Sequence, residues 1–254
     1  MIFTFRLKRF IALLMLAATF CAGVALSVAG DSYSVFFASS RRIPVYSVEN
    51  GKKTVALTFD AAYGADKTSA IMDVLEREGV DATFFLVGFW VKNFPDKAKE
   101  IAERGFEIGT HSNVHGHMSK MGASEIKDDL DASMQRIRQA TGITPTVFRA
   151  PYGEYDDKVV SVAESLGLMT VQWSVDSLDW KNISKATIVE RVRVKAHPGC
   201  IVLMHNNSDF VVDALPEIIA YFKAEGYEFC RVGDMIYRQN YYVDNSGRQH
   251  LKNN

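Results

Sequence analysis

The chain has almost no net charge, because its 29 Lys and Arg residues are balanced by 30 Asp and Glu residues, for a formal charge of -1. The basic residues are interleaved with acidic ones, and no RNP, zinc-finger or P-loop pattern is present. These absences argue against a nucleic-acid-binding protein, so we expect no nucleic-acid partner.

Cysteine is also scarce, with three residues in the chain. Cys21 lies in an apolar N-terminal run, which leaves Cys200 and Cys230 at or near predicted strands. Two cysteines do not make a disulfide framework. The sequence leaves open whether this pair forms one bridge or two buried free thiols.

One long apolar run is present, at residues 10–30, and three basic residues within positions 6–9 precede it. A positive flank followed by such a run indicates a signal anchor or a cleaved signal peptide. Its length fits a bilayer span. We therefore expect contact with a membrane through residues 10–30 and an extracytoplasmic location for the rest of the chain, either anchored or secreted.

The chain after residue 30 is long enough to form one domain with a sizeable core, and 48% of all residues are hydrophobic. We expect a linker at 31–50, a domain at 51–239 and a loose polar tail at 240–254. Short apolar segments predict strands at 54–59, 82–87, 106–110, 146–148, 169–174, 201–204 and 228–231. Helical patterns separate them, at 67–78, 95–104, 124–141, 156–166, 185–196 and 211–224.

Glycine and serine positions support these helix boundaries. Ser124 and Ser184 are placed as N-caps. Five glycines are placed as C-caps, namely Gly79, Gly105, Gly142, Gly167 and Gly226. Regular alternation of strand and helix predicts an α/β fold with a parallel sheet. Seven strands would close into a small, distorted (β/α)7 barrel, and an open doubly wound sheet is the alternative.

Titratable residues follow one predicted strand after another. In parallel α/β domains active sites gather at the carboxyl ends of strands. We therefore expect one site to be built from the residues in these positions, which are Asp60, His111, His115, Arg149, Tyr152, Asp176, Asp179, Trp180 and His205, with His117 in a supporting or surface position.

Two pairs among these residues suggest acid–base chemistry beside a metal. His111 and His115 are four residues apart, a spacing that on a helical turn lets two neutral imidazoles bind one divalent ion. A two-pronged hydrogen bond from Arg149 would keep Asp60 ionised as a general base. A carboxylate such as Asp179 would favour protonated His205, a general acid.

The ordered motifs "TFDA", "HSNVH", "RAPYG", "DSLDW" and "LMH" resemble those of the polysaccharide deacetylases of the NodB-homology group, over roughly residues 53–237. The resemblance implies a distorted (β/α)7 barrel of that type. It also implies a divalent-metal-dependent hydrolase that removes acetyl groups from N-acetylated sugars, with some relatives acting on O-acetylated xylan.

The resemblance implies a role for each matching residue. Asp60 matches the catalytic base, and Arg149 matches the arginine that holds it. His111 and His115 match the metal ligands. Asp179 matches the carboxylate that tunes the catalytic acid, and Asp176 begins the same motif in a supporting position. The remaining matches are His205 as the catalytic acid, Tyr152 with Pro151 at the oxyanion position, and Trp180 and Leu203 as apolar walls around the acetyl methyl group.

The chain departs from the family pattern at Ala61, where a metal-binding aspartate usually stands. Three explanations are open. Water fills the vacant ligand position, Asp66 replaces the missing ligand, or the enzyme is catalytically weakened. For Asp66 the alternative is an N-cap of the following helix. The stretch "TFDAAYGADKT" resembles the loop of a subgroup that includes sporulation-type deacetylases.

The sequence therefore predicts a metal-dependent, monomeric deacetylase acting on the amino sugars of peptidoglycan at the cell wall. Zinc is the preferred ion for a histidine-rich site, and cobalt and nickel are compatible with it. The alternatives are an O-acetyl esterase on xylan, a deacetylase of chitin oligosaccharides, or a glycan-binding pseudoenzyme that lacks turnover because of Ala61.

Overall fold

The computed structural model describes residues 41–252. The predicted signal segment and most of the predicted linker lie outside these residues. In the part of the chain that is described, no helix combines the length and apolar character needed to cross a membrane. Residues 42–254 make up one unit by their contacts.

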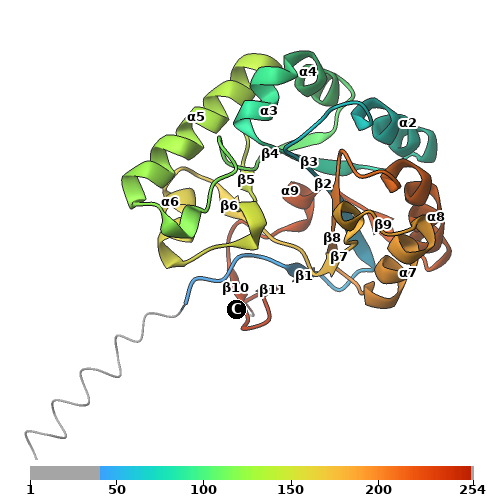
Figure 1. Cartoon of the computed structure of the whole chain (residues 1–254). Coiled ribbons are helices and arrows are strands. Elements are labelled where there is room, and N and C mark those ends of the chain that lie inside the picture. Colours follow the sequence, from blue (N-terminus) through green and yellow to red (C-terminus); the bar gives the residue numbers. More distant parts are fainter. Residues whose placement is uncertain (1–40, 253–254) are drawn as a thin grey trace, which may run out of the picture. The chain divides into compact units, whose positions relative to one another are not determined.

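The centre of the fold is a mostly parallel sheet (Figure 1). Its strand order is β10-β11-β1-β8-β2-β3-β4-β5-β6, with β7 added beside β8 and β9 beside β2. The strands are β1 (Ser47–Glu49), β2 (Thr54–Ala61), β3 (Ala82–Leu86), β4 (Glu107–Thr110), β5 (Val147–Phe148), β6 (Met169–Thr170), β7 (Val175–Asp176), β8 (Cys200–His205), β9 (Glu228–Phe229), β10 (Tyr241–Val243) and β11 (Arg248–Leu251).

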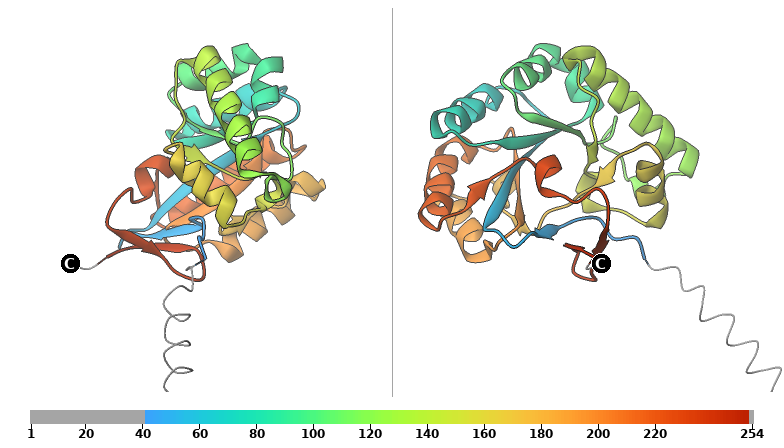
Figure 2. Two further views of the ribbon diagram at one scale, coloured as in Figure 1. Left: turned by 90° about the vertical axis from the view of Figure 1, so that its left-hand side faces the viewer. Right: turned by 180° about the vertical axis from the view of Figure 1, so that it is seen from behind.

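Helices cover the outer side of the curved sheet, as both views in Figure 2 show. They are α2 (Thr68–Glu78), α3 (Gly88–Asn93), α4 (Pro95–Glu103), α5 (Ala123–Thr141), α6 (Asp157–Ser165), α7 (Lys185–Lys195) and α8 (Val211–Ala224). The short α9 (Val232–Met235) lies on the inner face instead (Figure 1), where Val232 and Met235 pack with Ala56, Phe85 and Ile201. Three single 3₁₀ turns lie in the loops, η2 (Met118–Lys120), η3 (Pro151–Gly153) and η4 (Asp179–Lys181).

The β6 end of the curved sheet meets the other side through short pairings, including that of β7 with β8. An isolated parallel bridge joins Val45 to Val171, and a single antiparallel pair joins Ser47 to Cys200. The predicted α/β class is therefore confirmed in a coarser form, an α/β half-barrel. Because the carboxyl ends of β2, β3, β4, β5 and β8 point the same way, the loops that follow them share one rim.

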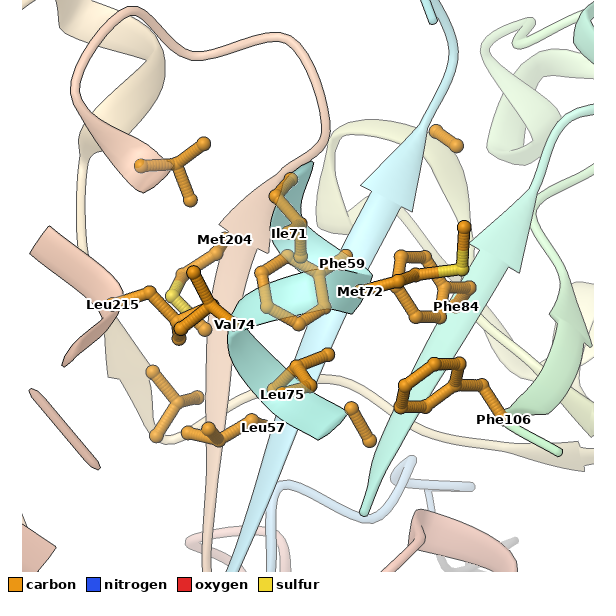
Figure 3. Close-up of a cluster of buried hydrophobic side chains, with 14 of the residues drawn as sticks. Leu57, Phe59, Ile71, Met72, Val74, Leu75, Phe84, Phe106, Met204 and Leu215 are labelled. Atoms are coloured by element: carbon orange, nitrogen blue, oxygen red, sulfur yellow. The ribbon is translucent and has the colours of Figure 1, made fainter. Parts of the chain in front are cut away.

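The largest apolar cluster lies between the sheet and helices α2 and α8 (Figure 3). Phe59 of β2 stacks on Phe84 of β3 with ring centroids 5.1 Å apart, and Phe106 meets Phe84 edge-on. Ile71 and Leu75 are fully buried one helical turn apart on α2. Each such side chain contributes about 1.5–3 kcal/mol through burial. This packing anchors β2, the strand that carries Asp60.

Several boundaries differ from those predicted. The polar segment after residue 240 is not a loose tail, because it forms β10 and β11, and β11 pairs with β1 inside the predicted linker. The helix predicted at 95–104 is preceded by a separate helix, α3, which ends at Asn93, two residues before Pro95, because proline cannot continue it. The strand predicted at 169–174 is short, and β7 follows it as an additional strand.

Helix caps agree with the sequence in part. Ser184 accepts a hydrogen bond from the Thr187 N–H, as predicted. Ser124 is not an N-cap, because α5 begins after Gly122, and the Glu125 side chain accepts the Gly122 N–H at 2.6 Å. Gly79 and Gly142 are left-handed C-caps. The other three predicted glycines lie one residue past the C-cap, also with positive φ: Gly105, Gly167 and Gly226.

Both described cysteines are free thiols. Cys200 pairs with Val55 from the β8 side of β2, and the Cys230 N–H donates to the Val55 carbonyl from the β9 side. Two strand spacings of about 4.8 Å place their backbones too far apart for a disulfide. Next to Cys200, Gly199 has φ +75°, and a Cβ there would lie 1.7 Å from the Val48 carbonyl oxygen. Only glycine fits this crossing of β1 and β8.

Candidate active site

A cavity of about 490 Å³ opens at the rim formed by the strand ends. This volume lies within the range of ~300–1,000 Å³ typical of ligand pockets. Eight residues predicted for the site line it, namely Asp60, His111, His115, Tyr152, Asp176, Trp180, Leu203 and His205. The structure also brings Ala62, Tyr63, Ala150, Trp173 and Asn207 to the wall. Asp66 and His117 are not part of it.

Asp60 lies within β2 and not after its end, because the strand continues through Ala61 and pairs with β3 and β8. Side chains alternate along a strand, so Thr58 and Asp60 share the face that is opposite to the helices. The Asp60 carboxylate is 4% exposed and accepts a hydrogen bond of 2.7 Å from Arg149 Nη1. Strand geometry therefore fixes the position of this carboxylate.

Arg149 is fully buried, and its guanidinium makes hydrogen bonds to three groups. Nη1 donates to Asp60 and to Thr58 Oγ1 at 2.9 Å, while Nη2 donates to the Gln172 carbonyl oxygen at 3.0 Å. The predicted two-pronged bond to Asp60 is therefore wrong, because the second nitrogen binds a backbone carbonyl in the segment between β6 and β7. The guanidinium also lies 4.1 Å from the centre of the Phe85 ring.

The environment of Asp60 keeps it ionised. Burial alone would raise the pKa of the Asp60 carboxyl, but the positive charge of Arg149, together with His111 and His205, outweighs this effect. The net pKa of Asp60 lies below its ordinary value. At neutral pH the cavity therefore contains a carboxylate that can accept a proton.

His111 is a neutral imidazole whose tautomer is set by its partner. Its Nδ1 lies 2.8 Å from the Arg149 carbonyl oxygen, which can only accept, so Nδ1 carries the proton. Burial lowers the pKa of His111. The unprotonated Nε2 then lies 3.4 Å from Asp60 Oδ2. Two acceptor atoms face each other at this point, an arrangement that a cation stabilises.

His115 lies beside His111 with ring centroids 4.9 Å apart, although no helical turn joins them. The connecting loop turns back through left-handed backbone at Ser112 and at His115 itself. The pKa of His115 is lowered to about 4, mainly by burial and secondly by the charge of His111, so its ring is neutral. Its Nδ1 is buried and has no hydrogen-bond partner. The predicted pair is thus brought together by loop geometry and not by helical spacing.

These observations fit a divalent ion held by two imidazoles. The orphaned Nδ1 of His115 and the facing acceptors of His111 and Asp60 are the donor types that zinc and similar ions take. Within residues 41–252, no cluster of three or more His, Cys, Asp or Glu side chains has metal-binding spacing. An ion held by two imidazoles would keep coordination positions for water and substrate.

Neither candidate role of Asp66 agrees with the structure. Asp66 is exposed and does not line the cavity. Helix α2 has Lys67 at its N-cap and no side-chain cap, so the N-cap interpretation is wrong as well. Ala61 is fully buried in the apolar cluster beneath the helices and offers no donor atom.

His205 and Asp179 form a second polar pair across the rim. His205 Nδ1 lies 2.8 Å from Asp179 Oδ1, and the His205 backbone N–H donates to the other oxygen, Oδ2, at 2.8 Å. Burial lowers the pKa of His205, but the Asp179 carboxylate outweighs it, and the net pKa is raised. Asp179 is itself fully buried, and the Ser208 hydroxyl donates to its backbone carbonyl. His205 therefore remains protonated to higher pH than an isolated histidine.

The turn η3 places Tyr152 on the opposite wall. Pro151 is buried, whereas the Tyr152 ring is 56% exposed and contacts the rings of His115 and His117. Tyr152 has φ 59° and ψ 6°, a left-handed conformation that costs a residue with a side chain of order 1–3 kcal/mol. Such strain is typical of functional turns. Trp180, which is exposed, and Leu203, which is buried, add apolar wall.

Sequence reasoning missed four residues around the site. Thr58 lies two residues before Asp60 on the same strand face, a spacing that would have indicated a shared partner. Trp173 lies over Arg149 at 5.7 Å. Tyr63 and Asn207 each lie two residues past the end of a strand, β2 and β8 respectively, where a polar residue that lines the cavity could have been expected.

Comparison with known proteins agrees with this geometry. A family model described as polysaccharide deacetylase matches residues 47–171. The chain is 34% identical over 203 residues to the uncharacterized protein YlxY of Bacillus subtilis, an alignment that covers 80% of this chain and 63% of YlxY. It thus spans less than two thirds of that relative. It is 31% identical over 222 residues to the peptidoglycan-N-acetylmuramic acid deacetylase PdaA of Bacillus subtilis, with 86% and 81% covered.

A solved structure of a CE4 family protein has a similar fold. The structure of wild-type BA3943, described as a CE4 family pseudoenzyme from Bacillus anthracis, matches with a TM-score of 0.74 at 34% identity. The match covers 82% of this chain and 72% of that chain. Similar proteins thus include one named as a deacetylase and one named as a pseudoenzyme.

Proposed function

Because the chain belongs to the polysaccharide deacetylase family, we propose that it hydrolyses acetamido groups of an N-acetylated cell-wall glycan and releases acetate. The proposed substrate class is peptidoglycan, and the proposed location is outside the cytoplasmic membrane, with membrane contact through residues 10–30. One observation carries the proposal: an ionised carboxylate, two neutral imidazoles and a histidine with a raised pKa face a single cavity.

His111 and His115 would hold the metal, with zinc as the proposed ion. When bound, the ion would polarise the acetyl carbonyl and make a nearby water more acidic. Asp60 is in the protonation state of a general base and takes the proton of the attacking water. Arg149 holds the carboxylate in place and is not itself a proton donor, because guanidinium does not deprotonate in proteins.

His205 supplies the proton that the leaving nitrogen needs. Its raised pKa keeps that proton bound to higher pH than in an ordinary histidine, and Asp179 fixes the tautomer by accepting from Nδ1. The Nε2 side is then free to face the substrate. The Tyr152 backbone N–H is the proposed hydrogen-bond donor to the developing oxyanion. Trp180 and Leu203 would pack on the acetyl methyl group.

The metal assignment predicts a clear difference between variants. Purified wild type, reconstituted with zinc and then desalted, is expected to retain about one equivalent by elemental analysis. His111→Ala and His115→Ala remove one of two imidazole ligands and are expected to lose most of it. Asp66→Asn changes an exposed residue outside the cavity and should retain it. Loss of zinc in Asp66→Asn would instead make Asp66 the replacement ligand.

The assignment of His205 predicts a shift in pH dependence. Asp179→Asn removes the charge that raises the pKa of His205, so that pKa should fall. The protonated acid is then lost at lower pH, and the alkaline limb of the kcat profile moves downward in pH. NMR of histidine-labelled protein measures the pKa directly. Asp244→Asn, beside the distant His250, is the matched control. An unmoved alkaline limb in Asp179→Asn would argue against His205 as the acid.

A glycan-binding pseudoenzyme is the second candidate, favoured by Ala61 and by the similarity to the Bacillus anthracis pseudoenzyme. Acetate release from peptidoglycan and from N-acetylglucosamine oligomers, measured with added zinc, cobalt or nickel, separates the two candidates. Metal-dependent release supports the hydrolase. Oligomer binding by calorimetry without any release, in protein whose fold is verified by circular dichroism, supports the pseudoenzyme.

A further inference from the structure

Tyr63 is the most exposed aromatic residue of the cavity wall, with 58% of its surface accessible. Its ring centroid lies 5.8 Å from that of Phe89 and 6.1 Å from that of His115, the second proposed metal ligand. These two rings support Tyr63 from the side of helix α3 and from the floor of the cavity. A large apolar ring surface therefore remains open directly beside the proposed reaction centre.

The loop that carries Tyr63 is held in place by several contacts. The Gly64 carbonyl oxygen accepts two hydrogen bonds, from Trp90 Nε1 at 2.6 Å and from Asn206 Nδ2 at 2.9 Å. Gly64 has φ +59°, which favours glycine at this turn. Lys67 then joins the loop to Asp209 with an ion pair of 2.8 Å. The exposure of Tyr63 is therefore a property of a fixed loop.

Asn207 lies on the adjoining wall, directly after the Asn206 that binds the Gly64 carbonyl. A Cβ atom built on Gly64 would lie 3.6 Å from the Asn207 Cβ, so the two loops are in close contact. The Asn207 side chain is exposed, lines the cavity and makes no hydrogen bond within the described part of the chain. An amide that can both donate and accept thus lies beside an open aromatic ring.

We propose that Tyr63 and Asn207 form a subsite for the sugar ring next to the acetylated sugar. A pyranose presents C–H groups on its faces and hydroxyl groups around its edge. The faces match an aromatic ring, and the edge matches an amide that donates and accepts hydrogen bonds. Pockets with a few polar groups among aromatic walls bind such amphipathic ligands. This inference rests on the proposed function, because it assumes a glycan in the cavity.

The test compares a long substrate with a minimal one. The probes are the N-acetylglucosamine tetramer, which would reach the subsite, and 4-methylumbelliferyl acetate, which offers only an acetyl group. In the full chain, Tyr63→Ala should lower the ratio of kcat/KM for the tetramer to that for the ester about tenfold, mainly through KM, the size of effect expected for one aromatic contact. Asn207→Ala should lower the same ratio, and Tyr63→Phe should keep most of it.

Tyr242→Ala is the matched control, because Tyr242 is exposed to a similar extent (49%) on β10 and does not line the cavity. Its ratio should equal that of wild type. An equal ratio in Tyr63→Ala would overturn the subsite while leaving the proposed hydrolase intact. If wild type neither binds the tetramer in calorimetry nor releases acetate from it, both the proposed function and the subsite fail. The failure of the subsite alone and the failure of the proposed function are therefore distinguishable.

Discussion

Asp60→Asn is expected to lower kcat for acetate release about a thousandfold, within the ~10²–10⁴ range for loss of a positioned general base. Asparagine has nearly the same shape and keeps an oxygen that can accept from Arg149 Nη1, but it cannot take a proton. The measurement is acetate release from the N-acetylglucosamine tetramer at saturating substrate. Circular dichroism must show that the variant is folded, because Arg149 loses the charge of its partner.

Asp128→Asn is the control for this substitution, since Asp128 is an exposed aspartate on α5, away from the cavity. Its kcat should match that of wild type. Calorimetry with the tetramer adds a second readout, because a folded Asp60→Asn variant that still binds the oligomer has lost turnover specifically. Activity within tenfold of wild type in this variant would refute the assignment of Asp60 as the base.

Arg149→Met is expected to cost about 3–5 kcal/mol of unfolding free energy at pH 7, the usual effect of removing one partner from a buried ion pair. Asp60 would be left ionised and buried without its partner, and the stacking of the guanidinium on Phe85 would also be lost. Urea denaturation measures the change. Arg138→Met, which replaces an exposed arginine near the end of α5, should change stability by no more than about 0.5 kcal/mol.

The double variant Asp60→Asn/Arg149→Met isolates the pair. It removes both charges, so it should be more stable than Arg149→Met alone, with a coupling of about 0.5–3 kcal/mol. Additive effects would show that the ion pair does not account for the loss. This cycle separates the electrostatic role of Arg149 from its packing, which the single variant alone does not.

The loss in Arg149→Met should also depend on pH. In wild type the folded pKa of Asp60 is depressed, so its contribution is present above its unfolded pKa and is lost as pH falls through the folded pKa. Without Arg149, burial dominates and raises the folded pKa above the unfolded one. The deficit should therefore be largest near neutral pH and shrink as the solution is acidified and Asp60 is protonated. A deficit that does not vary with pH would contradict this account.

The residues of the proposed active site could be named from sequence because each lies at or just after the carboxyl end of a buried parallel strand. Asp60, His111, Arg149 and His205 come from four strands that the apolar segments revealed, and parallel strands end on one rim. The four residues lie close together because their strands are buried side by side and run in the same direction. Ordered motifs then identified the family, because several chemically specific residues recur in one order along the chain.

Contacts between distant segments were not predictable in the same way. Strand β11 pairs with β1 across about 200 residues, and polar sequence in both segments gave no sign of pairing. The Arg149 guanidinium binds the backbone carbonyl of Gln172, which belongs to a different segment of the chain. No local sequence pattern encodes such a contact. Helix α3 was missed because six residues are too few for a periodic pattern.

Local periodicity and the order of the polar residues thus determined the α/β class, most strand positions and the choice of the proposed acid, the proposed base and the two imidazoles. The tertiary structure decided how these groups act together. In the folded chain, only one nitrogen of Arg149 binds Asp60, and a left-handed loop brings His111 and His115 together. Asp66 lies outside the cavity, and Tyr63 lies beside Asn207 on its wall. Hydrogen-bond geometry, burial and the pKa values that follow from them arise between segments far apart in the chain, and for that reason they appear only once the chain is folded.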